Sequence, residues 1–158
     1  MINRLLKTLD RVQAAPIANA HCDGPCGVYD PASARVAGEA VRSMTKKILA
    51  LTPPDPSDAH AVARYHNTLS RYVAIKEEQA GITKSELLIL WTDYFKPVHL
   101  ADHPDLHDTI WKATKLCSAC KVEVSATHAD ELMEAIENIH NIFWKTKGRD
   151  VKWELAAP

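Results

Sequence analysis

The sequence predicts an all-α protein, an up-and-down bundle of four main helices. Apolar residues recur at spacings of three and four along most of the chain, which is the period of an amphipathic helix. Asp, Ser, Pro and Gly, which start and stop helices, separate these runs. No strand-like alternation, glycine-rich phosphate loop or internal repeat competes with this interpretation. At 158 residues and 46% hydrophobic content, the chain is long enough for one domain with a core and too short for two.

The first helix of the bundle is expected to begin at Asp30, whose carboxylate can cap it, with Pro31 in its first turn. Pro53 and Pro54 end it. Its apolar face is predicted to consist of Val36, Ala40, Met44 and Ile48.

The second helix is expected to start at a cap formed by Ser57 or Asp58 and to run towards Gln79, before Gly81 stops it. A mixed apolar stripe marks it: Val62, Leu69, Val73 and Lys76.

The middle of the chain is predicted to be irregular. Thr83 and Glu86 form a capping-box pattern, which indicates a short apolar helix over residues 87–91. The stretch DYFKPVHLADHP, residues 93–104, breaks the helical spacing, and Asp105 to about Cys120 restores it.

The last long helix is expected to open at Ser125 or Thr127. Its apolar stripe is formed by Leu132, Ile136, Ile139 and Phe143. The tail after Lys147, residues 148–158, is predicted to be a poorly specified extension.

Composition excludes several classes of partner. Charged residues make up 25% of the chain and the formal net charge is −1, so neither a nucleic acid nor an anionic membrane surface is expected to bind. No apolar run approaches the roughly 18 residues that a membrane span needs. The four cysteines fall in two close pairs, which is typical of metal or redox chemistry in a reducing compartment such as the cytoplasm.

Residues 1–20 allow two interpretations. Their leucines lie at helical spacing, so on pattern alone an ordinary amphipathic first helix is favoured. Ala18 and Ala20 also give the segment a cleavable end, although it lacks the continuous apolar stretch of a secretory signal. The residues that follow Ala20 favour a leader that is removed on maturation.

The segment HCDGPCGVY, residues 21–29, indicates a metal site. It places His21, Cys22 and Cys26 within six residues of one another, a density of soft ligands that core packing does not require. A structural zinc site needs four side-chain ligands and this segment offers three. If the chain is cut after Ala20, the α-amine of His21 and the amide nitrogen of Cys22 can join the two thiolates. This planar N₂S₂ set favours Ni(II) or Cu(II) and leaves the His21 imidazole for an axial position.

The string HCDGPCGVYDP resembles the nickel hook of the nickel superoxide dismutases. The stretches LWTDYFKPVH, residues 90–99, and NIFWKTK, residues 141–147, are also similar to that family. The resemblance therefore extends over residues 21–147, which would form the dismutase domain.

The resemblance implies a right-handed four-helix bundle, removal of residues 1–20 by a dedicated peptidase, and a homohexamer whose hooks are enclosed by neighbouring subunits. It also implies one nickel ion per subunit, which cycles between Ni(III) and Ni(II) while superoxide is converted to oxygen and hydrogen peroxide.

Roles for individual residues follow from the same resemblance. Tyr29 and Tyr94 would flank the open axial face and restrict access to small anions. Asp23, Pro25 and Gly27 would shape the hook, with a cis bond before Pro25 and a turn at Gly27 that a side chain would obstruct. Lys96 would supply a local positive charge that attracts superoxide.

The sequence departs from the family pattern at the two positions whose side chains would hold the axial imidazole. Where a Glu and an Arg are expected, this chain has Ala37 and Gln79. Both members of the pair are missing together, so no lone buried charge is left, and the donor set itself is intact.

Other candidates are assigned ordinary structural roles. Cys117 and Cys120 form a C-x-x-C outside any βαβ unit and are interpreted as two ordinary thiols. None of the scattered histidines is assigned as a ligand. The aromatic residues of the helical runs are interpreted as core or subunit contacts: Trp91, Trp111, Phe143 and Trp144. Trp153 in the tail is left unassigned.

Two rival functions remain open from the residues alone. One is a non-enzymatic helical bundle that binds nickel or copper through the same hook. The other is a thiol-redox or interaction bundle in which both cysteine pairs form disulfides.

Overall fold

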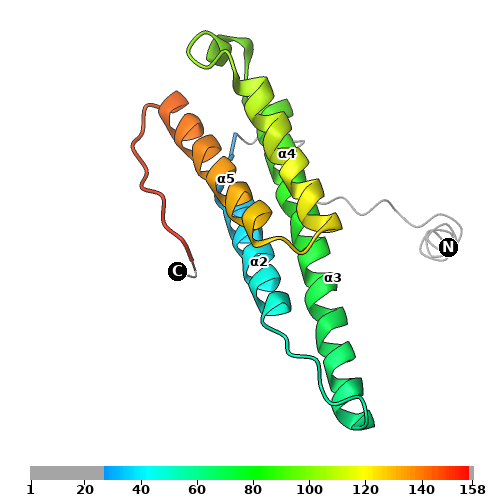
Figure 1. The fold of residues 1–158 in the computed structure, drawn as a ribbon. Coiled ribbons are helices and arrows are strands. Elements are labelled where there is room, and N and C mark those ends of the chain that lie inside the picture. Colours follow the sequence, from blue (N-terminus) through cyan, green and yellow to red (C-terminus); the bar gives the residue numbers. More distant parts are fainter. Residues whose placement is uncertain (1–26, 157–158) are drawn as a thin grey trace, which may run out of the picture.

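The computed structural model describes residues 27–156, in which four long α-helices follow one another without a strand (Figure 1). The long helices are α2 (Ala32–Leu49), α3 (Ala59–Ile89), α4 (Leu106–Val122) and α5 (Ala126–Thr146). A π-helical segment, η1 (Leu90–Tyr94), and a short 3₁₀ helix, η2 (Pro97–Leu100), connect α3 to α4. The prediction of an all-α fold is confirmed.

The helices run alternately up and down the bundle (Figure 1). Each one packs against two others, so that α2 contacts α3 and α5, while α4 also contacts α3 and α5. The helix α3 is the longest, and its first turns extend beyond both α4 and α2. The connection formed by η1 and η2 lies at the end of the bundle where α2 begins and α5 ends.

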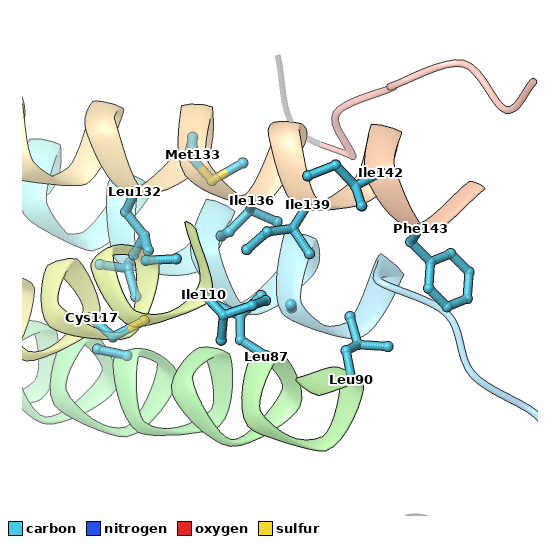
Figure 2. Packing of buried hydrophobic residues seen from close by; sticks show 14 of the residues in the cluster. Leu87, Leu90, Ile110, Cys117, Leu132, Met133, Ile136, Ile139, Ile142 and Phe143 are labelled. Carbon is cyan, nitrogen blue, oxygen red and sulfur yellow. The ribbon is translucent and has the colours of Figure 1, made fainter. Parts of the chain in front are cut away.

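The core lies along the inner face of α5, as its apolar spacing predicts. Figure 2 shows Ile136 and Ile139 of α5 pointing towards Leu87 of α3 and Ile110 of α4. Full burial of one such side chain contributes roughly 1.5–3 kcal/mol. The largest apolar side chains of the core that are entirely buried are Leu87, Leu106, Leu132, Ile136, Ile139 and Phe143.

Three predicted helix starts are confirmed by their capping hydrogen bonds. The Asp30 carboxylate accepts a hydrogen bond from the backbone N–H of Ala32 at 2.8 Å. Asp58, and not Ser57, caps α3 by accepting from the N–H of Ala61 at 2.9 Å. Ser125 caps α5 by accepting from the N–H of His128 at 3.2 Å. Each cap satisfies a backbone donor that the helix leaves unpaired.

The predicted apolar face of α2 is wrong. Val36 is 51% exposed, and Ala40, Met44 and Ile48 are only half-buried. Small residues form the core side instead, because they allow α2 to approach α5 closely. A Cβ at Gly38 would lie 2.6 Å from Cδ1 of Ile136, which is shorter than a van der Waals contact. The buried side of α2 consists of Ala34, Ala37, Gly38, Val41 and Thr45.

The predicted end of the second helix at Gly81 is also wrong. The helix α3 passes through Gly81, and Thr83 lies inside it with its hydroxyl donating to the carbonyl of Gln79 at 2.8 Å. Thr83 and Glu86 therefore do not start a new helix. A glycine within a helix costs about 1 kcal/mol relative to alanine, and packing of Ala80 and Leu87 against the core outweighs this cost.

The described part of the tail, residues 148–156, packs along the bundle, which corrects the expectation of a poorly specified extension. Residues 148–156, here called the C-terminal strap, run back beside α5 (Figure 1, orange to red). Val151, Trp153 and Leu155 pack against the core, and Nε2 of His140 lies 2.8 Å from the carbonyl oxygen of Val151. Trp153, left unassigned from the sequence, therefore covers the outer side of α5.

Candidate metal centre

The site is built around two tyrosines, and the first of them, Tyr29, is the last residue of the hook. Asp30 and Pro31 hold the chain at this point, because the Asp30 carboxylate caps α2 and Pro31 is buried in its first turn. The side chain of Tyr29 packs against the core cluster. The start of α2 thus fixes the end of the hook to the bundle.

The second tyrosine, Tyr94, is the last residue of η1. This segment contains a hydrogen bond from the N–H of Phe95 to the carbonyl of Leu90 at 2.9 Å, a spacing of five residues. The extra residue per turn is a π-bulge, a feature that often accompanies functional sites. After it the backbone becomes extended at Phe95, which is buried.

The two tyrosines meet although 65 positions separate them in the sequence. Their ring centroids lie 5.7 Å apart with the ring planes tilted by 54°. They line a depression of about 350 Å³ at the end of the hook. The residues around it are Gly27, Tyr29, Asp93, Tyr94, Lys96 and His99.

The hydroxyl of Tyr94 is held from the opposite side by Thr146. The two oxygens lie 2.7 Å apart, and the Thr146 hydroxyl donates to the carbonyl of Phe143, also at 2.7 Å. A threonine hydroxyl has a single proton. Tyr94 must therefore be the donor to Thr146, which directs its phenolic proton away from the depression.

His99 joins the site by two contacts. Its ring stacks on the ring of Tyr94, with centroids 5.6 Å apart and an angle of 24° between the planes. Its Nδ1 accepts a hydrogen bond from the backbone N–H of Lys96 at 3.1 Å. The neutral ring therefore carries its proton on Nε2. This bond fixes the backbone of Lys96 at the edge of the depression.

Two lysines and one aspartate set the charge around Tyr94. Lys96 is exposed and lines the depression together with Asp93. The ammonium of Lys147 lies 5.3 Å from the centroid of Tyr94 and 4.9 Å from that of Phe143, which is the geometry of a cation–π contact. The site thus has a local cationic surface within a chain of formal net charge −1.

Most of the predicted hook lies outside the described residues. This applies to His21, Cys22, Asp23, Pro25 and Cys26, so their ligand and hook-shaping roles stay predictions. Gly27 is described and has a φ of +68°, a left-handed conformation that favours glycine.

The chemistry of the donors points to the hook as the place for nickel. Within residues 27–156, no three His, Cys, Asp or Glu side chains lie close enough together to hold a metal ion. Cys117 and Cys120 are buried free thiols, and burial raises their pKa values to about 12 and about 11. They stay protonated at neutral pH, whereas thiolates are what nickel needs. The imidazole of His21 and the thiols of Cys22 and Cys26 are donors of the types that nickel binds.

The two positions where the family pattern has an acid and a base differ in burial. Ala37 is 3% exposed on the core side of α2, whereas Gln79 on α3 is half-buried.

The aromatic residues predicted to form core or subunit contacts differ in burial. Phe143 and Trp144 belong to the core, but Trp111 is 54% exposed and Trp91 is half-buried.

Sequence reasoning missed four residues of the site: Asp93, His99, Thr146 and Lys147. The signal that could have found them was the two stretches, DYFKPVH and FWKTK, in which they lie. Only the fold shows that the second stretch reaches Tyr94 of the first.

The fold is a small α-helical bundle, and its paired tyrosines and Lys96 lie next to a segment rich in His and Cys. These features are those of a small helical metalloenzyme. The profile of one family, described as nickel-containing superoxide dismutase, matches residues 16–147. The nickel superoxide dismutase of Streptomyces seoulensis is 39% identical over 129 residues, which cover 82% of this chain and 89% of that protein. That of Streptomyces coelicolor is 36% identical over the same shares.

Solved structures agree with these relatives. A nickel-containing superoxide dismutase crystallised in its oxidised ligation state has a TM-score of 0.69 and 38% identity, over 82% of this chain and 100% of that one. A native nickel superoxide dismutase gives 0.68 and 36%, over 80% and 99%. The chain belongs to the nickel-containing superoxide dismutase family. It is a nickel-dependent oxidoreductase that converts superoxide to oxygen and hydrogen peroxide.

Proposed function

We propose that dismutation takes place at the hook, residues 21–29, of a dismutase domain that spans residues 21–147. His21, Cys22 and Cys26 hold the nickel ion, one per subunit. Asp23, Pro25 and Gly27 shape the loop around it. The observation that carries this proposal is the pairing of Tyr29 and Tyr94 at 5.7 Å, beside Lys96, at the point where the hook joins the bundle.

Bound nickel would supply a redox couple, Ni(III)/Ni(II), that accepts an electron from one superoxide and gives it to the next. The residues of the chain control access and charge. Lys96 attracts the anion towards the depression by its positive charge. This local charge matters because the whole chain has a formal net charge of −1. Tyr29 and Tyr94 narrow the approach, so that small anions pass and larger ones do not.

Proton delivery is not assigned to Tyr94. Its phenolic proton is committed to Thr146 at 2.7 Å, and Thr146 in turn donates to the Phe143 carbonyl. Tyr94 can still accept hydrogen bonds from water or substrate through the remaining lone pairs of its oxygen. The role that follows is orientation of small molecules in the depression.

Substitution of the hook residues tests the ligand set. Cys22→Ser and Cys26→Ser should abolish superoxide decay, because hydroxyl groups do not stabilise trivalent nickel as thiolates do. His21→Ala should keep nickel bound and lose most of the turnover. Lys115→Ala, an exposed residue on α4, serves as the matched control and should change neither property. Full activity of either serine variant would contradict the proposed site.

Residues 1–20 are proposed to be a propeptide that a processing peptidase removes. The reason is chemical: before cleavage the nitrogen of His21 is an amide, and it becomes a primary amine only when the bond after Ala20 is cut. Mass spectrometry of the protein purified from its native host should show an N-terminus at His21. An active protein that retains Met1 would contradict this step.

The mature chain is proposed to form a homohexamer. One supporting observation is a group of apolar side chains at the surface around η2 and α4, beside an apolar hollow lined by Trp91, Phe95 and Leu100. Val98 is 69% exposed and Trp111 is 54% exposed. Exposed apolar side chains that gather in one patch mark a site of contact with another protein surface. Native mass spectrometry should give six times the subunit mass, and a monomer at micromolar concentration would contradict it.

The cytoplasm is the proposed location. Four cysteines in two close pairs suit a reducing compartment, and those that the structure describes, Cys117 and Cys120, are free thiols. None of the described helices is both long and apolar enough to cross a membrane. Fractionation of the native host should recover the activity with cytosolic markers.

A further inference from the structure

We propose that the C-terminal strap, residues 148–156, is a positioning element of the dismutase site. It would fix the last turn of α5, whose residues Thr146 and Lys147 hold Tyr94. The inference rests on Tyr94 belonging to the site. It concerns a segment beyond the part of the chain that the family profile matches, which ends at residue 147.

The strap begins by closing α5. Gly148 has a φ of +64°, its N–H donates to the carbonyl of Lys145 at 3.0 Å, and the N–H of Arg149 donates to the carbonyl of Trp144 at 3.0 Å. These two bonds form a Schellman motif, the arrangement that pairs the last carbonyls of a helix. Both donors belong to the strap. Without them the carbonyls of Trp144 and Lys145 would keep only the N–H of Lys147 as a donor.

The strap is then anchored at three further points. The guanidinium of Arg149 lies 4.6 Å from the ring centroid of Trp144. The carbonyl oxygen of Val151 lies 2.8 Å from Nε2 of His140, whose ring meets the ring of Trp153 at 5.2 Å in an edge-on arrangement.

At its far end the strap reaches α2. The backbone N–H of Ala156 donates to the buried carboxylate of Glu39 at 3.1 Å, and Arg35 pairs with the same carboxylate. The strap therefore joins the end of α5 to the middle of α2. A helix end frays less when the segment that follows it is itself anchored to the fold.

The turn that the strap closes is the turn that contacts Tyr94. Phe143 packs on the Tyr94 ring with centroids 4.4 Å apart, the Thr146 hydroxyl accepts a hydrogen bond from the Tyr94 hydroxyl, and Lys147 lies over its ring. These three contacts come from five consecutive residues. Fraying of this one turn would release the hydroxyl of Tyr94 and displace a cation from the site at the same time.

Two readouts that do not depend on bound nickel test the proposal in the full-length chain. The first is hydrogen exchange at the amides of residues 143–147. The second is the fluorine resonance of fluorotyrosine at position 94, assigned by its loss in Tyr94→Phe. Because neither measures activity, the strap can fail while the dismutase function stands, and the reverse also holds.

The variants remove one anchor each. Trp153→Ala deletes the contact with His140, and Gly148→Val disfavours the left-handed cap. Their conservative partners are Trp153→Phe, which retains an aromatic ring, and Gly148→Asn, which tolerates a positive φ. Lys152→Ala is the strap control, because this side chain is 83% exposed.

A second control is Ile136→Val, which leaves a small cavity far along α5 and lowers the midpoint of unfolding without touching the strap. In Trp153→Ala and Gly148→Val, exchange at residues 143–147 should rise about tenfold, as expected when one or two hydrogen bonds and a contact are lost. The fluorine resonance at position 94 should shift or broaden. The conservative variants should restore both signals, and both controls should leave them unchanged.

The proposal is overturned if the two disruptive variants, shown by circular dichroism to be folded, keep the exchange rates and the fluorine resonance of the parent. It is also overturned if Ile136→Val shifts the resonance as much as they do, since the effect would then be general loss of stability. If one disruptive variant does not fold, the other and its conservative partner decide between these outcomes.

Discussion

Lys76 should be one of the most sensitive positions of the bundle. Its side chain is 1% exposed, and its ammonium lies at the end of α4, where three backbone carbonyls surround it. It donates to the carbonyl of Cys120, to that of Lys121 at 3.1 Å and to that of Glu123 at 3.0 Å. A buried lysine from α3 thus replaces the water that would otherwise satisfy the end of α4.

The change Lys76→Met keeps the length of the side chain and removes the three donors. A hydrogen bond to a charged group contributes about 1.5–3 kcal/mol, but methionine also removes the cost of burying the charge. The net loss in the free energy of unfolding should be about 2–4 kcal/mol. For a chain of this size that corresponds to a fall in the unfolding midpoint of roughly 10 °C.

The assay is urea unfolding of the metal-free protein, followed by circular dichroism. Lys84→Met is the matched control, because Lys84 also lies on α3 but is half-buried and donates to a side chain, the hydroxyl of Ser118 at 3.1 Å. It should cost less than about 1 kcal/mol. If Lys76→Met lies within about 0.5 kcal/mol of the parent, the interpretation of Lys76 as a cap for α4 is refuted.

Three further predictions concern the bundle. Gly38→Ala should lower the free energy of unfolding by about 1–3 kcal/mol, because the new Cβ would lie 2.6 Å from Cδ1 of Ile136; no change in a thermal melt would contradict the close packing of α2 on α5. The pKa values of Cys117 and Cys120 are raised above 9.0, so the unfolded chain loses these protons first and stability should fall as the pH rises above about 9. Replacing both thiols by alanine should remove this fall, and an equal fall in that variant would disprove its cause. Asp58→Ala should cost about 1 kcal/mol in urea unfolding through loss of the cap of α3, and an unchanged midpoint would show that the cap contributes nothing.

The sequence predicted the helices where local signals and packing agree. In α5 the cap at Ser125 and the stripe of Leu132, Ile136 and Ile139 act together, and both are confirmed. Along α2 the largest apolar residues misled the prediction. Its inner face includes Ala34, Ala37 and Gly38, and only the partner helix shows that these residues need to be small.

Gly81 shows the limit of a local stop signal. Glycine ends a helix when the chain can turn there, but packing on both sides of this position continues α3. The prediction for the C-terminal strap was wrong because it lacked any local signal. Its contacts with His140 and Glu39 join residues 11 and 117 positions apart, and no local pattern encodes them.

For the site, the sequence supplied the donors and two aromatic residues through motifs. Tyr29, Tyr94 and Lys96 do line one depression. The support around Tyr94 could not be predicted, because Thr146 and His99 reach it only through the return of α5 and the π-bulge at η1.

The most direct test of the nickel site is the decay of a superoxide pulse, with nickel-loaded protein that begins at His21 compared with the same protein that begins at Met1. The cut form alone should accelerate decay towards the diffusional ceiling of about 10⁸ to 10⁹ M⁻¹s⁻¹, because only it offers the free amine of His21. Equal decay with both forms would contradict the proposed donor set. No acceleration by either form despite stoichiometric nickel would show that the hook does not support the reaction in this chain. Ala37 and Gln79, which replace the expected Glu and Arg, would then be the first positions to restore.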